Sequence, residues 1–341
     1  MIKIYKIIKI LTILCIVGVV IGIFSYQKVI NTPLKEKAGT KEFVVASGDS
    51  VKDISAKLSA NELIGSRFFF EFYIDRQDKE HNMQAGVYAL SPSMNIKEIV
   101  KILTKGQNIN NERAIKIIEG WNNRDIASYF AKEGLFKKER FLQEVKKVDK
   151  YANNFKFLQE IPKSYDMEGY LFPDTYKIYK KADLEDVVYK MLNNFDKKIT
   201  PQMRADIESK NKSLYEIMIM ASLIEKEVRK REDMEVVSGI FWNRLKNGQA
   251  LQSCATLAYV LGENKPVYST KDTKIDSPYN TYQNPGLPPA PIANPGLQAI
   301  KAAINPQETN YNYFLTATKT EKTIFSRTLR EHNINKEKYI K

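Results

Sequence analysis

The stretch from Ser213 to Val228, SLYEIMIMASLIEKEV, constrains the fold more than any other part of the chain. Ser213 can cap the N-terminus of a helix, and Glu216, three positions on, can bond back to it in a capping box. No Gly or Pro interrupts the residues after this cap. At about 100° per residue, one face of the helix gathers apolar side chains, namely Leu214, Ile217, Ala221, Ile224 and Val228. We therefore predict a helix that buries this face in a core.

Two glutamates near the end of this helix differ in their expected surroundings. In projection Glu225 falls on the apolar face, whereas Glu227 points about 200° away, beside Glu216. A carboxyl group in apolar surroundings loses hydration, so its pKa rises and it can serve as a general acid near neutral pH. The alternative is a solvated or paired Glu225, with Arg229 at i+4 as its partner. The helix alone does not decide between these interpretations.

The composition excludes several classes of protein. The 341 residues are 43% hydrophobic, which predicts a globular chain of about two domains. The net charge of +13 favours an anionic partner, but the lysines are scattered and no zinc-finger or RNP-type motif occurs, so nucleic acid is disfavoured. The two cysteines, Cys15 and Cys254, provide no disulfide framework, because Cys15 lies in an apolar segment. His81 and His332 are far apart, and no GxSxG occurs, so we expect no metal site and no cofactor.

The N-terminus has the pattern of a membrane anchor. Residues 1–9 carry three lysines and precede an uncharged, mostly apolar run from Ile10 to Gln27. A helix of that length spans about 27 Å, close to the thickness of the bilayer's hydrocarbon core. We predict a cytoplasmic tail over residues 1–9 and a single transmembrane helix over residues 10–28, with everything after it outside the cytoplasmic membrane. A cleaved signal peptide is the competing interpretation, although no A-x-A site follows the run.

The chain after the anchor is predicted to divide into a linker over residues 29–41, a small module over residues 42–110 and a larger domain over residues 111–341. The small module resembles a LysM module in its strand–GDS–x–x–x–I pattern, which is formed here by Val44, Val45, Gly48, Asp49, Ser50 and Ile54. LysM modules bind N-acetylglucosamine polymers, so the resemblance implies glycan binding. A packing unit without a ligand is the alternative.

A near-repeat links the small module to the larger domain. Gly48-Asp-Ser-Val-Lys-Asp-Ile-Ser matches Gly120-Trp-Asn-Asn-Arg-Asp-Ile-Ala, with Asp53 in register with Asp125. Each copy has the pattern of a strand, a glycine turn and a helix, and the second copy extends over residues 115–137. Two copies do not make a solenoid, so we interpret them as one small βα unit used twice.

Two loops carry residue types that suit a sugar ligand. In Tyr165–Tyr176, YDMEGYLFPDTY, aromatic side chains surround Glu168. Ser277–Pro306 holds seven prolines and cannot form regular helix or central strand before Gly296. Such a stiff loop would hold Tyr279, Asn280, Thr281 and Tyr282 in place for hydrogen bonds to hydroxyl and acetamido groups. For both loops, simple packing on a core is the alternative.

Taken together, the motifs resemble those of the YceG-like, or MltG-type, endolytic murein transglycosylases, over nearly the whole chain. In chain order, these motifs are Glu168-Gly169-x-Leu-Phe-Pro-Asp-Thr-Tyr, Ala221-Ser222-Leu-Ile-Glu225-Lys-Glu227, Asn243-Arg-Leu, Leu251-Gln252-Ser253, Tyr279-Asn280-Thr281-Tyr282, Gly286-Leu-Pro-Pro, Ile292-Ala-Asn-Pro-Gly296 and Ala302-Ala303-x-x-Pro306. One departure is Cys254-Ala255, where the family commonly has Asp-Pro.

The resemblance implies an α+β catalytic domain, anchored to the bacterial inner membrane, that cuts peptidoglycan glycan strands by lytic transglycosylation. It places the catalytic acid/base at Glu225, the residue that the helical projection also selects. It implies substrate contacts at Glu168, Gln252, Ser253, Tyr279, Asn280, Thr281 and Tyr282, with peptidoglycan synthases as candidate partners. A muramidase-type hydrolase that uses Glu168 as second carboxylate, and a non-catalytic glycan-binding scaffold, are the alternatives.

Overall fold

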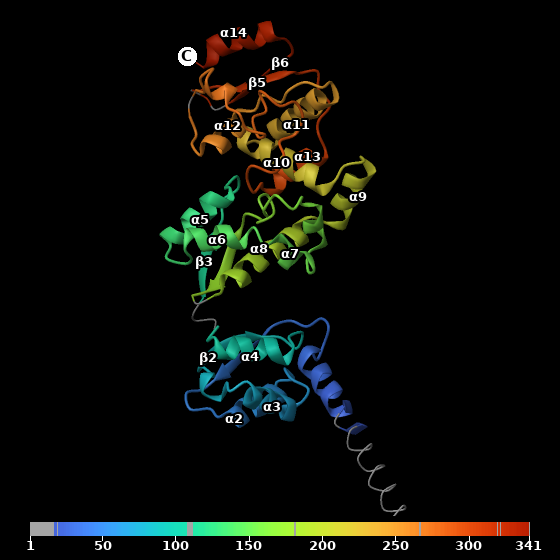
Figure 1. Ribbon diagram of the computed structural model, residues 1–341, viewed down its shortest axis with the longest axis vertical. Helices are drawn as coiled ribbons and strands as arrows, with labels where there is room; N and C mark the ends of the chain where they lie inside the picture. Colours follow the sequence, from blue (N-terminus) through green and yellow to red (C-terminus); the bar gives the residue numbers. More distant parts are fainter. Residues whose placement is uncertain are drawn as a thin grey trace, which may run out of the picture. The chain divides into compact units, whose positions relative to one another are not determined.

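The computed structural model describes residues 17–18, 20–107, 112–180, 182–265, 267–318, 320 and 322–340. The chain divides into two compact units, the first formed by Met1–Ala114 with Lys177–Ala182, and the second by Ile115–Tyr176 with Asp183–Lys341. Both units mix helices with two-stranded sheets, so the fold is α+β, as the sequence predicts (Figure 1).

The first unit is built around an antiparallel pair of strands. Its elements are β1 (Lys41–Val45), α2 (Val51–Ala60), α3 (Arg67–Arg76), the 3₁₀ turn η1 (Glu80–Asn82), β2 (Gly86–Leu90) and α4 (Ile96–Thr104). β1 pairs with β2 in the register Lys41↔Leu90 to Val45↔Gly86. Side chains alternate along β1, so Phe43 and Val45 enter the core while Val44 faces outward. The strand, glycine turn and helix that the sequence predicts for the first copy of the near-repeat are confirmed by β1, Gly48 and α2.

The near-repeat corresponds to the same local structure in both copies. Ser50 caps α2 in a capping box with Asp53, and Asn122 caps α5 (Asn123–Lys132) in a capping box with Asp125. The preceding glycines, Gly48 and Gly120, have φ values of 91° and 78°, which L side chains rarely adopt. The repeated residues therefore encode a glycine turn and a capped helix.

The N-terminal segment is helical over residues 20–31. Within the residues that the structure describes, no helix combines the length and apolar character needed to cross a bilayer. The transmembrane helix predicted over residues 10–28 falls partly outside the described part of the chain, which omits residues 1–16 and 19.

The second unit holds the remaining helices and hairpins. Its elements are α5, α6 (Lys138–Glu144), α7 (Val148–Ala152), η3 (Lys156–Glu160), α8 (Leu184–Lys198), α9 (Pro201–Ser209), α10 (Leu214–Glu227), α11 (Arg231–Lys246), α12 (Cys254–Leu261), η4 (Asp272–Lys274), α13 (Leu297–Ile304), β5 (Tyr313–Thr316), β6 (Thr323–Ser326) and α14 (Leu329–Tyr339). β3 (Glu112–Lys116) pairs with β4 (Thr175–Tyr179), and the division between the units runs through both strands.

The helix α10 is the centre of the second unit (Figure 1). The predicted capping box between Ser213 and Glu216 is confirmed. α10 packs against α9, α11, α12 and α13, and its side chains from Ile217 to Ile224 are buried on every side of the helix. A helix with apolar side chains on every face is stable in water only if other parts of the protein pack against every face. This burial fixes the positions of the glutamates near the C-terminal end of α10. The proline-rich segment 277–296 forms no helix or strand, and it covers part of α10.

Candidate active site

Glu225 lies near the C-terminal end of α10 and faces the start of α13. Its Oε2 accepts a hydrogen bond from the backbone N–H of Gly296, at 3.0 Å. Gly296 is the N-cap residue of α13, so the carboxyl group lies at the positive end of a helix. Gly120 lies on another side, where a Cβ atom would be 3.5 Å from Cγ of Glu225. Three segments far apart in the sequence thus meet at this carboxyl group.

Burial raises the pKa of Glu225 to about 7, because the charged form loses hydration. The hydrogen bond from Gly296 opposes this shift, the negative charge of Glu119 adds to it, and the positive charge of Lys226 opposes it. Lys226 is held nearby, since its Nζ donates to the carbonyl oxygen of Gly120 at 3.1 Å. A carboxyl group with a pKa near 7 can give a proton and take one back at neutral pH.

Glu119 is a residue of this site that the sequence analysis did not select. Gly296 has φ −74° and ψ 169°, values open to any residue, yet a Cβ there would overlap Oε1 of Glu119. Glycine at position 296 therefore lets the Glu119 carboxylate lie against the backbone that binds Glu225. The available signal was the acidic residue directly before the turn glycine Gly120, where the first copy of the repeat has Ser47.

The expectation that only Glu225 of the two neighbouring glutamates is desolvated is wrong. Glu227 does point to another side of α10, but the start of α12 covers it. The hydroxyl of Ser253, the N-cap residue of α12, donates to Oε1 of Glu227, and burial raises the pKa of Glu227 as well. A helical projection cannot detect this covering, because α12 comes from a later part of the chain.

Glu168 is buried inside a network of loops. It is 4% exposed, its Oε1 accepts from Nδ2 of Asn294 at 3.1 Å, and both its oxygens accept from the N–H of Asn123 at 3.0 Å. Burial first, and the charge of Asp166 second, raise the pKa of Glu168 well above its ordinary value. Because the carbonyl oxygen of Asn294 also accepts from the N–H of Gly120, this network positions the turn beside Glu225.

Three of the other candidates, Ser253, Asn280 and Thr281, are buried and hold the proline-rich loop. Asn280 donates from Nδ2 to the carbonyl oxygens of Thr273, at 3.1 Å, and Ile275, at 2.8 Å. Thr281 accepts at Oγ1 from the N–H of Ser253, at 3.0 Å. In this structure these side chains bond to the protein rather than facing open space.

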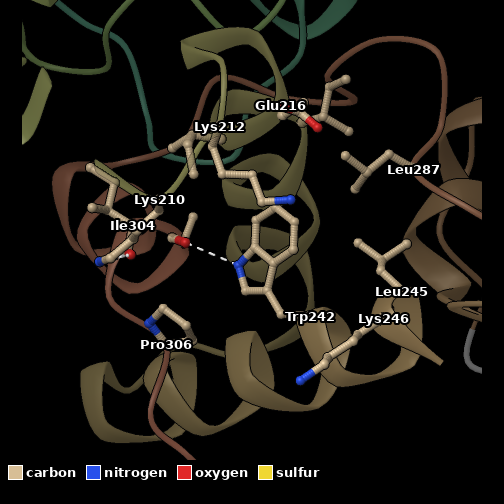
Figure 2. A pocket seen from close by; sticks show the side chains of 12 residues that line it. Lys210, Lys212, Glu216, Trp242, Leu245, Lys246, Leu287, Ile304 and Pro306 are labelled. Carbon is tan, nitrogen blue, oxygen red and sulfur yellow. Dashed lines mark hydrogen bonds between the residues drawn. The ribbon is translucent and has the colours of Figure 1, made fainter. Parts of the chain in front are cut away.

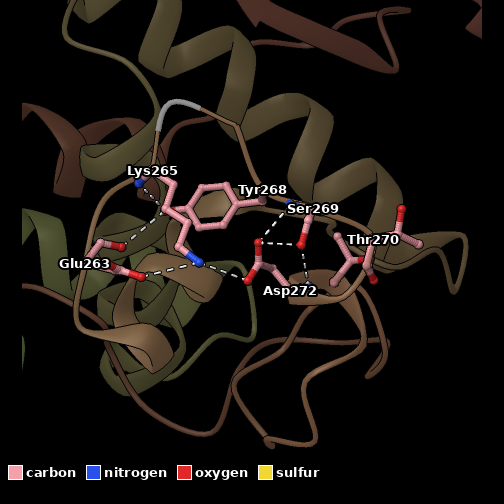
Figure 3. A network of polar contacts seen from close by, with 7 residues as sticks. Glu263, Lys265, Tyr268, Ser269, Thr270 and Asp272 are labelled. Carbon is pink, nitrogen blue, oxygen red and sulfur yellow. Dashed lines mark hydrogen bonds and ion pairs between the residues drawn. The ribbon is translucent and has the colours of Figure 1, made fainter.

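The segment just before this loop has its own polar network (Figure 3). The Nζ of Lys265 contacts carboxylate oxygens of Asp272 at 3.0 Å and Glu263 at 3.3 Å. Asp272 also accepts from the N–H and the hydroxyl of Ser269, both at 2.8 Å. These contacts brace the backbone around Thr273, which Asn280 then binds.

The candidates that reach the surface are Gln252, Tyr279 and Tyr282. The side chain of Gln252 is exposed. Its backbone has a φ of 52°, and its N–H donates to the carbonyl oxygen of Thr281 at 3.1 Å. Tyr279 and Tyr282 are half-buried. The hydroxyl of Tyr282 lies 3.1 Å from Sγ of Cys254, so position 254 does lie among the candidate residues despite its departure from the family pattern.

Two of the cavities beside α10 lie toward its two ends. A polar cavity of about 310 Å³ lies beside Lys226 and is lined also by Asn122, Arg124, Tyr259 and Ile292. A larger cavity of about 770 Å³ is lined by Glu216, Ile217 and Ile219, from the first two turns of α10. In this larger cavity the Nζ of Lys212 lies 4.4 Å from the centroid of the Trp242 ring (Figure 2). Of these two cavities, the smaller one adjoins the Glu225 site through Lys226.

Comparison with known proteins gives one consistent answer. The model of the YceG-like family matches residues 43–338. A Bacillus subtilis (strain 168) protein named endolytic murein transglycosylase is 35% identical over 332 residues, which cover 94% of this chain and 90% of that protein. A protein of the same name from Streptococcus pneumoniae serotype 2 (strain D39 / NCTC 7466) is 32% identical over 94% of this chain and 62% of its own length. A crystal structure of a yceG-like protein from Listeria monocytogenes has a TM-score of 0.61 and 33% identity, and covers 88% of this chain and 100% of that one.

Proposed function

The chain belongs to the YceG-like family, and from this membership we propose that it is a peptidoglycan lytic transglycosylase, acting as the name endolytic murein transglycosylase says of its relatives. It cleaves the bond between N-acetylmuramic acid and N-acetylglucosamine within nascent glycan strands. The cut leaves 1,6-anhydro-N-acetylmuramic ends and so limits strand length.

In the proposed mechanism Glu225 acts first as an acid and then as a base. Its protonated carboxyl group donates to the glycosidic oxygen as the bond to the anomeric carbon breaks, and positive charge develops on the sugar ring. The carboxylate then takes the proton from the C6 hydroxyl of the muramic residue, whose oxygen bonds to C1. The proton that Glu225 gave is thereby restored, and no water is consumed.

The observation that carries this proposal is the carboxyl group of Glu225, whose pKa is about 7 and whose neighbour in the chain, Lys226, lines a cavity of about 310 Å³. A group that must be protonated in one step and ionised in the next works best when its pKa lies near the working pH. The negative charge of Glu119 favours the protonated form of Glu225 and would also face the cationic ring.

The nearest rival is a hydrolase that uses Glu168 as a second carboxylate. The burial of Glu168 and its hydrogen bonds to Asn123 and Asn294 favour a positioning role instead. Of the remaining candidates, Gln252, Tyr279 and Tyr282 are the ones exposed enough to meet sugar directly, while Ser253, Asn280 and Thr281 support them from below.

The proposal includes attachment to the bacterial cytoplasmic membrane by a helix over residues 10–28, with the N-terminus in the cytoplasm and both units outside. The lysines before the apolar run support this orientation. In that compartment the net charge of +13 suits anionic wall polymers and phospholipid head groups. The LysM-like module would add glycan binding, and the synthases that make the strands would be its neighbours.

The test is mass spectrometry of the products from uncrosslinked glycan strands incubated with the full chain in detergent. Fragments with ends lighter by one water, absent with Glu225→Gln, are the expected result. Reducing ends would instead identify a hydrolase, with Glu168→Gln as the next variant. Glycan binding without any cleavage, unchanged in Glu225→Gln, would favour the scaffold.

A further inference from the structure

The helix α3 exposes aromatic side chains that a soluble surface would be expected to bury. Its sequence, RFFFEFYIDR, places Phe70 and Ile74 in the core of the first unit, but leaves Phe68 68% and Phe72 38% exposed. Tyr26, Phe69 and Tyr73 are partly buried next to them. We name these five side chains, Tyr26, Phe68, Phe69, Phe72 and Tyr73, the aromatic shelf. A cluster of exposed aromatic residues of this kind marks an interaction surface.

The aromatic shelf is preorganised rather than a set of separate side chains. The rings of Phe68 and Phe72 stack at 6.0 Å with an angle of 9° between their planes, and Tyr26 meets Phe72 edge-on at 5.3 Å. Together with Ile23 and Ile30, the shelf lines a cavity of about 880 Å³. The whole cavity is formed within the first unit, between α3 and the helix of residues 20–31.

Three positively charged side chains lie at the aromatic shelf, and α3 itself also carries Glu71 and Asp75. The guanidinium carbon of Arg76 lies 5.9 Å from the centroid of the Phe72 ring, and Nζ of Lys79 lies 6.0 Å from that of Tyr73. Lys97 lines the cavity as well. Aromatic rings with cationic groups beside them match the interface of a bilayer, where rings lie at head-group depth and cations meet anionic lipid.

The shelf is also continuous with the apolar N-terminal run. Tyr26 lies at the end of the uncharged stretch from Ile10 to Gln27, and Ile21, Ile23 and Phe24, on the same helix, are 59%, 57% and 73% exposed. The apolar surface continues from this helix onto α3. This continuity favours lipid over a second copy of the chain, because a bilayer can cover the exposed apolar side chains of both helices at once.

We propose that the aromatic shelf inserts into the head-group region of an anionic phospholipid bilayer, so that α3 is a second membrane attachment beside the N-terminal run. The first unit then lies on the membrane surface instead of moving freely on residues 29–41. The aromatic shelf belongs to the first unit and Glu225 to the second, and they share no residue, so the inference stands or falls independently of the catalytic proposal.

The experiment uses the full chain with Cys15→Ser and Cys254→Ser, reconstituted into vesicles that contain an anionic phospholipid. A single cysteine is introduced as Phe68→Cys and labelled with an environment-sensitive fluorophore. The matched control is Val44→Cys on β1, a position that is 52% exposed and outside the shelf. Circular dichroism of both labelled proteins verifies that they are folded.

Phospholipids brominated near the head group should quench the label at Phe68→Cys at least twofold more than the label at Val44→Cys. The emission of the Phe68→Cys label should also shift to shorter wavelength when vesicles replace detergent, and shift less when the vesicles are neutral. Equal quenching at the two positions would overturn the proposal. A blue shift that depends on protein density, without bromolipid quenching, would also overturn it and assign the shelf to a second copy.

Discussion

Replacing Glu119 by Gln should shift the pH dependence of glycan cleavage to lower pH. In the proposed mechanism Glu225 must be protonated to act as an acid, so activity should fall as pH rises through its pKa, which is about 7. The negative charge of Glu119 raises that pKa. Glu119→Gln keeps the shape of the side chain and removes the charge, so the alkaline limb of the pH–rate profile should move to lower pH.

The size of the shift follows from the geometry around Gly296. The carboxylate of Glu225 accepts a hydrogen bond from the N–H of Gly296 at 3.0 Å, and a Cβ atom added to Gly296 would overlap Oε1 of Glu119. Two unit charges about 7 Å apart interact by roughly 0.6 kcal/mol at the dielectric constant of water, which is about 0.4 pKa units. Glu119 is exposed, so the water-like value applies, and a shift of about half a unit is expected.

The assay is the rate of release of anhydro-ended fragments between about pH 5 and pH 9, at saturating glycan. Gly296→Ala is an independent variant, because its Cβ must push the Glu119 carboxylate away while its φ of −74° suits alanine. Both variants should move the alkaline limb in the same direction, and Glu119→Asp should move it less. An unchanged limb in Glu119→Gln, with only a lower maximum rate, would refute the electrostatic argument.

Three further predictions concern buried carboxyl groups. Because the pKa of Glu225 is higher in the folded state than its ordinary value of 4.5, its contribution to stability is intact below about pH 4.5 and is lost as pH rises through about 7. Glu225→Gln should therefore be inactive yet more stable at about pH 8, by up to roughly 3 kcal/mol, with little difference at about pH 4.5, as thermal melts at both pH values would reveal. Glu168→Gln should keep the fold and the anhydro product, since its Oε1 can still accept from Asn123 and Asn294, whereas Glu168→Ala should lose about 2 kcal/mol or more in urea unfolding; loss of the product in a folded Glu168→Gln would revive the two-carboxylate hydrolase. Ser253→Ala should cost about 1–3 kcal/mol in the same measurement, because Glu227 loses a hydrogen-bond donor, and a neutral result would mean that this bond is dispensable.

Helix caps and turns could be predicted from the sequence because they depend on interactions between residues a few positions apart. The capping box of Ser213 depends on two side chains three positions apart, and the structure has the same device at Ser50, Asn95 and Asn122. The turns of the near-repeat are equally local, since Gly48 and Gly120 both have positive φ. The likeness of motifs pointed to the YceG-like family before the comparisons established it.

The helical periodicity predicted the surroundings of Glu225 correctly and those of Glu227 incorrectly. Periodicity on α10 predicts that Glu225 faces apolar neighbours, and its raised pKa agrees. The same periodicity predicts that Glu227 is solvated, which is wrong because Ser253 at the start of α12 closes over it. A projection describes one helix, whereas desolvation depends on everything that packs against it.

The capped helix α10, the turns of the near-repeat and the choice of Glu225 as candidate acid follow from residues a few positions apart in the sequence. The groups that surround Glu225 come from distant parts of the chain and are visible only in the folded protein. Glu119, Gly296 and Glu225 are brought together by the packing of α13 on α10 and by the turn that Asn294 binds. The pKa of a carboxyl group depends on burial and on charges within a few ångströms, whatever their distance along the chain. That is why the position of Glu119 before Gly120 marks it in the sequence, whereas its effect on Glu225 is evident only in the folded protein.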